Sequence, residues 1–223
     1  MTNEKLLQLQ FALFFTTNEN RPDKLITKVD NAFGELFDQM PNMINLPSDA
    51  PLELPRITMQ SSDGIYACNI GINRIDFIGH YIDSGSSVTV NVQDFIKKVY
   101  LLSSEIFADR EIIRFGLVGQ YFIESASAVE KITTKYLNID IENLEEINIR
   151  FNKNFINGGL TMNDVVEISK GSVTIANISQ KDGILIQRDI NNKPTKVLEF
   201  NEMKSIIESN ESKLLLSGIR ELI

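Results

Sequence analysis

The segment Arg56–Tyr81, RITMQSSDGIYACNIGINRIDFIGHY, contains three short runs rich in β-forming residues, separated by two turn signals. The runs are Arg56–Gln60, Ile65–Gly71 and Arg74–Tyr81, and the turn signals between them are Ser62-Asp63-Gly64 and Gly71-Ile72-Asn73. Short turns of this composition are typical of hairpins, in which consecutive strands pair antiparallel. The segment therefore predicts three neighbouring antiparallel strands.

Further strands and helices are predicted on both sides of this segment. Leu6–Thr17 and Ile112–Ile123 are apolar runs of strand length, and two glycines in the second run indicate a bulge or a close backbone approach. Apolar residues at helical spacing predict two helices, and Ser125–Leu137 predicts a third. The first helix begins at Pro22 and ends at Pro41, and its predicted buried stripe is Leu25, Val29, Phe33, Leu36 and Met40. The second helix is predicted to be capped by Asn91, and its buried stripe is Val92, Phe95, Val99, Leu102 and Ile106.

The final third predicts an antiparallel meander followed by a terminal helix from about Asn201 to Leu222, broken near Asn210. The predicted strands are Leu144–Phe155, Asp164–Lys170, Ser172–Ser179 and Gly183–Asp189, with turn signals at Asn157-Gly158-Gly159, Lys170-Gly171-Ser172 and Lys181-Asp182-Gly183. Strands thus come in consecutive runs separated by helices. This order predicts an α+β fold of mostly antiparallel sheets with three to four helices, divided into residues 1–137 and 138–223 or forming one continuous domain.

Composition narrows the classes of function. The 223 residues are 43% hydrophobic, so the chain can bury a core without disulfides or a metal. Its net charge is −8 and its longest basic run is Lys97-Lys98, which disfavours nucleic-acid binding. An apolar stretch long enough to span a membrane is absent from the sequence, and so is a secretory signal, so we expect a cytoplasmic protein without a membrane partner.

Imidazole and thiol chemistry is scarce, because His80 and Cys68 are the only histidine and cysteine. A zinc site would need more such ligands, and phosphate-binding glycine loops are absent, so we expect no metal and no cofactor. His80 lies near Asp83 and several serines, but the nucleophile-elbow pattern is missing. We therefore expect His80 to be a half-exposed packing or hydrogen-bonding residue and Cys68 to be a small core residue.

Two arginines interrupt otherwise apolar strands. Arg74 and Arg114 each place a guanidinium within a β run. A buried arginine would need carboxylate or carbonyl partners, whereas an arginine on the solvent face of an antiparallel sheet would not. We expect both on the solvent face.

Several short motifs recur in a known group of proteins. They are Asp63-Gly64 through Tyr81 after an N-terminal apolar strand, a helix with Phe95, the Arg-Phe-Gly-Leu strand Arg114–Leu117, and Asp189-Ile190 before the last helix. In this layout the chain resembles a sporadically distributed family of uncharacterised bacterial proteins. The resemblance implies a bacterial source but neither an activity nor any site residue.

Three functions remain open. The leading one is a non-catalytic binding or protein-interaction protein of a bacterial cytoplasm, acting on a protein partner or on itself through free sheet edges. The second is an enzyme with a carboxylate-based site in a cleft, whose candidate catalytic residues are His80, Asp83, Arg114 and Glu124. The third is a phage- or defence-associated component whose acidic surface competes for basic sites.

Overall fold

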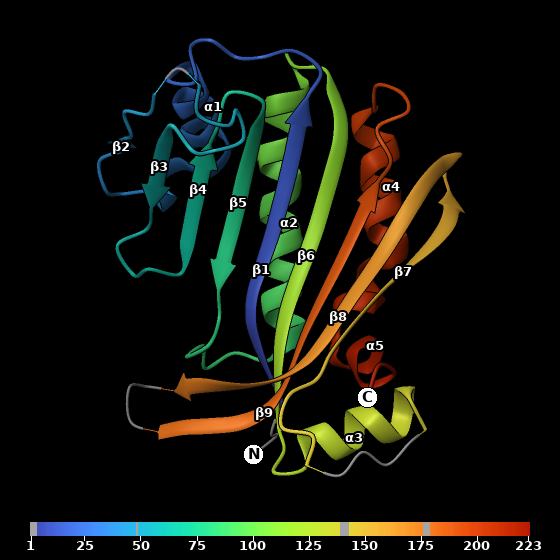
Figure 1. Cartoon of the computed structure of the whole chain (residues 1–223). Coiled ribbons are helices and arrows are strands. Elements are labelled where there is room, and N and C mark those ends of the chain that lie inside the picture. The colour runs from blue at the N-terminus through green and yellow to red at the C-terminus, as the bar shows by residue number, and fades with distance from the viewer. Residues whose placement is uncertain (1–3, 48, 139–142, 176–178) are drawn as a thin grey trace.

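The computed structural model describes residues 4–47, 49–138, 143–175 and 179–223, and its strands form one nine-stranded antiparallel sheet (Figure 1). The strand order is β2-β3-β4-β5-β1-β6-β9-β8-β7. The strands are β1 Glu4–Phe15, β2 Asn42–Met43, β3 Ile57–Gln60, β4 Tyr66–Ile70, β5 Arg74–His80, β6 Ile112–Glu124, β7 Asn148–Asn157, β8 Leu160–Ile175 and β9 Ser179–Asn192. The predicted α+β class with antiparallel strands is confirmed.

The described residues form five α-helices, against the three to four predicted. They are α1 Lys24–Phe33, α2 Val88–Phe107, α3 Ala128–Tyr136, α4 Phe200–Asn210 and α5 Leu216–Arg220, with short 3₁₀ turns at Gly34–Leu36 and Glu211–Leu214. The terminal helix breaks at Asn210, as predicted, and so counts as two. None of these helices combines the length and the apolar character needed to cross a membrane.

The core lies between the sheet and the helices α1, α2 and α4, which lie behind the sheet in Figure 1. Successive residues of a strand point to opposite faces, so Leu9, Phe11 and Leu13 of β1 are buried against the helices while Gln10 points away. The predicted stripe of α2 is confirmed, since all five of its apolar residues are fully buried. The near face of the sheet, called the open face below, carries no helix over β5, β1 and β6 (Figure 1).

The helix α1 is shorter than the helix predicted to end at Pro41. It ends at Phe33 because Gly34 adopts a φ of 60°, a left-handed conformation that glycine reaches without steric cost. The chain then turns, so that Phe37 is buried and Met40 is 92% exposed. The assignment of Met40 to the buried stripe is therefore wrong.

The start of α2 also differs from the prediction, because Ser87 rather than Asn91 is its N-cap. The Ser87 side chain accepts a hydrogen bond from the Val90 amide at 3.3 Å, and the predicted extended piece Val88–Val90 is the first helical turn. Asn91 lies inside the helix, where its side chain bonds Ser84.

Ser87→Ala is expected to lower the free energy of unfolding by about 0.5 to 2 kcal/mol, because it leaves an amide of the first turn without its acceptor. Urea denaturation measures the change. Ser86→Ala is the matched control, since the Ser86 side chain makes no hydrogen bond in the described structure. Equal stability of the two variants would contradict the assigned cap.

The C-terminal meander has three strands instead of four. β8 runs through Gly171 and β9 runs through Gly183, so neither glycine lies in a turn. Part of the predicted strand Ser172–Ser179, residues 176–178, lies outside the described residues. Residues 139–142, beside the predicted boundary at 138, also lie outside them, and the sheet continues across that boundary because β6 pairs with β9.

The close approach predicted for β6 is found at Gly119. A Cβ atom there would lie 2.5 Å from the Tyr121 hydroxyl, so the tyrosine ring occupies the space above the glycine. The same hydroxyl donates a 2.6 Å hydrogen bond to the Leu214 carbonyl. Gly119 thus lets a buried tyrosine connect the sheet to the C-terminal helical segment.

Candidate functional site

Three side chains form a stacked row on the open face, where β5, β1 and β6 lie side by side. The strand register places Phe14 between Arg74 and Arg114. The two guanidinium carbons lie 4.7 and 5.0 Å from the centre of the Phe14 ring. Cation–π attraction holds both cations against the ring and leaves the edges of the guanidinium groups available for hydrogen bonds.

The two arginines differ in their partners. Arg74 donates two hydrogen bonds to Asp76, one of them from Nε to Oδ2 at 2.7 Å, and Gln10 donates to the same carboxylate at 2.8 Å. Within the described ranges Arg114 has no carboxylate at ion-pair distance, and its Nε is buried without an acceptor. Both arginines lie on the solvent side of the sheet, as expected, but of the two only Arg74 is paired with a carboxylate in the described chain.

Arg114 borders a hollow of about 510 Å³ in the open face, within the size range of small-ligand pockets. We call it the Arg114 hollow; its lining includes Phe14, Glu53, Arg114, Gly116 and Asp189. Gly116 has no side chain to cover the backbone of β6. A Cβ atom added there would have room, because its nearest neighbours, Asn191 Cβ and Asp189 Oδ1, would lie 3.7 and 3.8 Å away. A ligand group can therefore approach the sheet backbone closely at this point.

Two carboxylates line the hollow from different sides: Glu53 lies in the loop that packs on the β4–β5 turn, and Asp189 lies on β9. Neither has a cation at ion-pair distance in the described chain. Asn191 donates to Asp189 Oδ1 at 3.0 Å, Asn163 donates to Asn191 at 2.9 Å, and Asn154 donates to Asn163 at 2.8 Å. This amide chain crosses β7, β8 and β9. It fixes the orientation of the Asp189 carboxylate without adding charge.

The four predicted catalytic candidates are not brought together. Arg114 and Glu124 lie at opposite ends of β6, ten residues and so roughly 33 Å apart, and Glu124 pairs with Lys181 at 3.0 Å. His80 and Asp83 are exposed, and no hydrogen bond in the described structure joins them. Nor do three His, Cys, Asp or Glu side chains meet anywhere in the described ranges as a metal site would require.

Cys68 lies on β4 with its side chain fully buried. Burial raises the pKa of the Cys68 thiol well above its usual range, with a smaller contribution from the charge of Asp76. The thiol therefore stays protonated and packs as a small core residue, as the sequence predicted.

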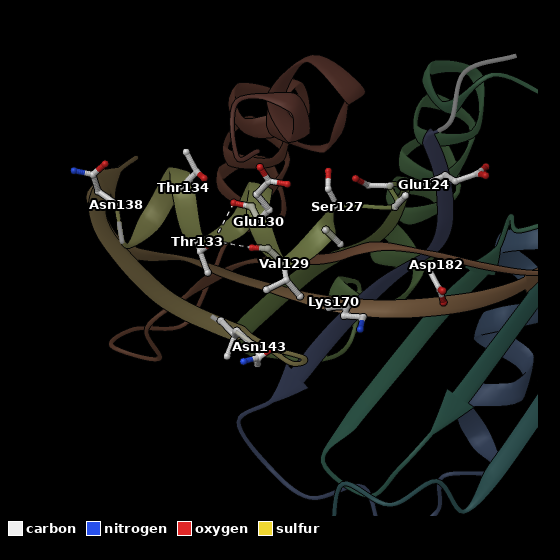
Figure 2. Close-up of a pocket in the computed structure, with 14 residues that line it drawn as sticks. Glu124, Ser127, Val129, Glu130, Thr133, Thr134, Asn138, Asn143, Lys170 and Asp182 are labelled. Carbon is white, nitrogen blue, oxygen red and sulfur yellow. Dashed lines mark hydrogen bonds between the residues drawn. The ribbon is translucent and has the colours of Figure 1, made fainter. Parts of the chain in front are cut away.

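A second hollow, of about 1040 Å³, lies beside α3 (Figure 2). Two of its polar groups serve local structure: the Thr133 hydroxyl lies 3.0 Å from two carbonyl oxygens of its own helix, and Lys170 donates to the Glu145 carbonyl at 3.0 Å. Figure 2 shows Glu130 and Lys170 pointing away from each other. The polar groups drawn there do not converge, and Arg114 on the open face provides the better-defined site.

Comparison with models of known protein families gives no match, and comparison with curated proteins gives none either.

Proposed function

We propose that this protein is a non-catalytic binding protein that holds a carboxylate of a protein partner in the Arg114 hollow. The observation that carries the proposal is the guanidinium of Arg114, stacked on Phe14 with a buried Nε that has no acceptor in the described chain. The terminal nitrogens Nη1 and Nη2 have no acceptor in the described chain either and, unlike Nε, are not buried, so they can receive an incoming carboxylate. A planar guanidinium also matches the two oxygens of a carboxylate.

The charge of the hollow favours a carboxylate over a phosphate. Arg74 and Arg114 both line the hollow, but Arg74 is paired with Asp76, so the unpaired charges are one positive charge on Arg114 and two negative charges on Asp189 and Glu53. A doubly charged phosphate would be repelled by these carboxylates more strongly than a singly charged carboxylate. The proposal therefore names an acidic side chain or terminal carboxylate as the bound group.

The open face is also a better contact surface than the sheet edges. At one edge β2 is only two residues long. At the other edge β7 carries Lys153, an exposed cation on the face otherwise occupied by Ile149, Phe151 and Phe155. Short edge strands and inward-pointing lysines are devices that oppose strand pairing with another chain. We therefore place the partner on the open face, and we retain the bacterial cytoplasm as the proposed compartment.

A phage-displayed library of random octapeptides tests the proposal. Selection on the wild-type protein is expected to enrich peptides with aspartate or glutamate. Arg114→Ala is expected to weaken the selected peptides about tenfold to a hundredfold in fluorescence anisotropy, because one charge-assisted contact is lost. Arg150→Ala, an exposed arginine on β7, is the matched control and should change affinity less than twofold.

Two results would overturn the proposal. One is a selection that shows no preference for acidic residues. The other is binding to Arg114→Ala that equals binding to the wild type. Circular dichroism of each variant shows that the fold is retained, so that a loss of binding is assigned to the side chain.

A further inference from the structure

We infer that Asp189 is a second anchor of the Arg114 hollow and takes a cationic group of the same partner. The inference rests on the proposed function and adds the chemical class of the bound segment: an extended peptide that carries an acidic and a basic residue.

The positions of the two anchors set the spacing of the ligand charges. The guanidinium of Arg114 lies level with its own backbone position along the strand, because it stacks on Phe14, the residue paired with Arg114 on β1. The Asp189 carboxylate lies beside Gly116, with Oδ1 at 3.8 Å from the place of an added Cβ atom. Arg114 and Gly116 are two residues apart on one strand, which is roughly 7 Å. Along the strand the anchors are therefore offset by about two extended residues, and across the sheet they lie on either side of β6, toward β1 and on β9.

The unpaired charges of the hollow favour a cation in the ligand. A partner that brought only a carboxylate would neutralise Arg114 but would leave Asp189 and Glu53 without a counter-charge in the described chain. Removing these carboxylates from water without a counter-ion is unfavourable. A lysine or arginine of the partner would pair with the Asp189 carboxylate. The partner could then cover the hollow without leaving the charge of Asp189 unpaired.

Neighbouring asparagine side chains orient the Asp189 carboxylate. Asn191, itself 3% exposed, donates to Asp189 Oδ1 and receives a hydrogen bond from Asn163. The carboxylate is thus held in one orientation, while no donor in the described structure occupies Oδ2. Asn191 is a positioning residue, and Asp189 is the residue that contacts the ligand.

An extended peptide presents every second side chain on the same side, about 6.6 to 7 Å apart. In a peptide that runs along β6, an acidic residue and a basic residue two positions later would lie level with Arg114 and Asp189, and their side chains would lean to opposite sides of β6 to reach them. This predicts the pattern acidic–any–basic, or its reverse, in the bound segment. Adjacent charges would point to opposite sides and could not use both anchors.

Isothermal titration with three blocked pentapeptides tests the inference: Ser-Glu-Ser-Lys-Ser, Ser-Glu-Ser-Ser-Ser and Ser-Glu-Lys-Ser-Ser. The first is expected to bind the wild type about tenfold more tightly than the other two. Asp189→Asn, which keeps the shape and one acceptor, is expected to abolish that preference. Asp189→Lys should instead prefer a fourth peptide, Ser-Glu-Ser-Glu-Ser. Asp182→Asn, an exposed acid elsewhere on β9, is the control and should retain the wild-type preference.

The outcomes separate this inference from the proposed function. If Arg114→Ala weakens the glutamate peptides while Asp189→Asn keeps the preference for the first peptide, the second anchor is wrong and the carboxylate site stands. If Arg114→Ala changes nothing, both fail. Equal affinity of the wild type for all three peptides would also overturn the second anchor.

Discussion

Arg188→Ala is expected to lower the free energy of unfolding by about 3 kcal/mol, because it removes both hydrogen bonds to a buried carboxylate and leaves Asp164 only Lys213, at 3.2 Å, as a counter-charge. Arg188 on β9 is 8% exposed and Asp164 on β8 is 5% exposed. The guanidinium donates from Nε and Nη2 to the two carboxylate oxygens at 2.8 and 2.7 Å, and from Nη1 to the carbonyls of Lys213 and Gly218 at 3.1 and 3.3 Å. One side chain thus connects the sheet to both short helical segments at the C-terminus.

Urea denaturation of three variants measures this effect. Arg150→Ala removes an exposed arginine and should change the unfolding free energy by less than about 0.5 kcal/mol. The double variant Asp164→Leu/Arg188→Met should recover most of the loss, because an apolar pair leaves no buried charge. A loss in Arg188→Ala no larger than that in Arg150→Ala would show that the pair does not hold the two layers together.

The same pair predicts how stability depends on pH. Burial alone would raise the pKa of Asp164, but the hydrogen bonds from Arg188 and the charges of Arg188 and Lys213 outweigh it, so the pKa lies below the ordinary 3.8. A carboxyl group with a lowered folded pKa stabilises the fold above its unfolded pKa and loses that contribution as pH falls through the folded value. The stability difference between the wild type and Asp164→Asn should therefore be constant above about pH 5 and shrink below about pH 4.

The strands and the long helix could be predicted because each depends on a local pattern. Alternation and turn chemistry place β3, β4 and β5, and the helical period of apolar residues places α2. Alternation also separates Gln10 from its buried neighbours on β1, and by the same parity Phe14 lies on the polar face. The apolar run Leu6–Thr17 predicted a strand but did not single out Phe14 as a residue of the open face.

The site itself required the register between strands that are distant in sequence. Arg74, Phe14 and Arg114 form one row only because β1 lies between β5 and β6. Asp189 reaches the same hollow through the pairing of β6 with β9. No spacing along the chain specifies this strand order. Sequence reasoning could therefore select the two arginines as unusual but could not show which of them lacks a partner.

Glycine was the least informative residue in the last third, because it marks both turns and close contacts. Gly158 and Gly159 lie at the turn between β7 and β8 with φ values of 58° and 76°, as predicted. Gly171 and Gly183 were assigned to turns as well, but they face each other in the paired strands β8 and β9. Their role is to let other atoms approach the backbone, and the two positions differ in which atoms approach.

Gly183→Ala is expected to lower the free energy of unfolding by about 3 kcal/mol or more, because its Cβ atom would lie 2.2 Å from the Ile123 carbonyl oxygen and 2.7 Å from the Phe122 ring. The obstacle is backbone of the paired strand β6, so relief requires the two strands to separate. Gly171→Ala is the matched control: its Cβ would meet the end of the Leu185 side chain at 2.3 Å, and a leucine can change rotamer for about 1 kcal/mol. Thermal and urea denaturation should therefore show that the Gly183→Ala variant is much less stable than the Gly171→Ala variant. If the two lose equal stability, the close contact between β6 and β9 is not what requires glycine at position 183.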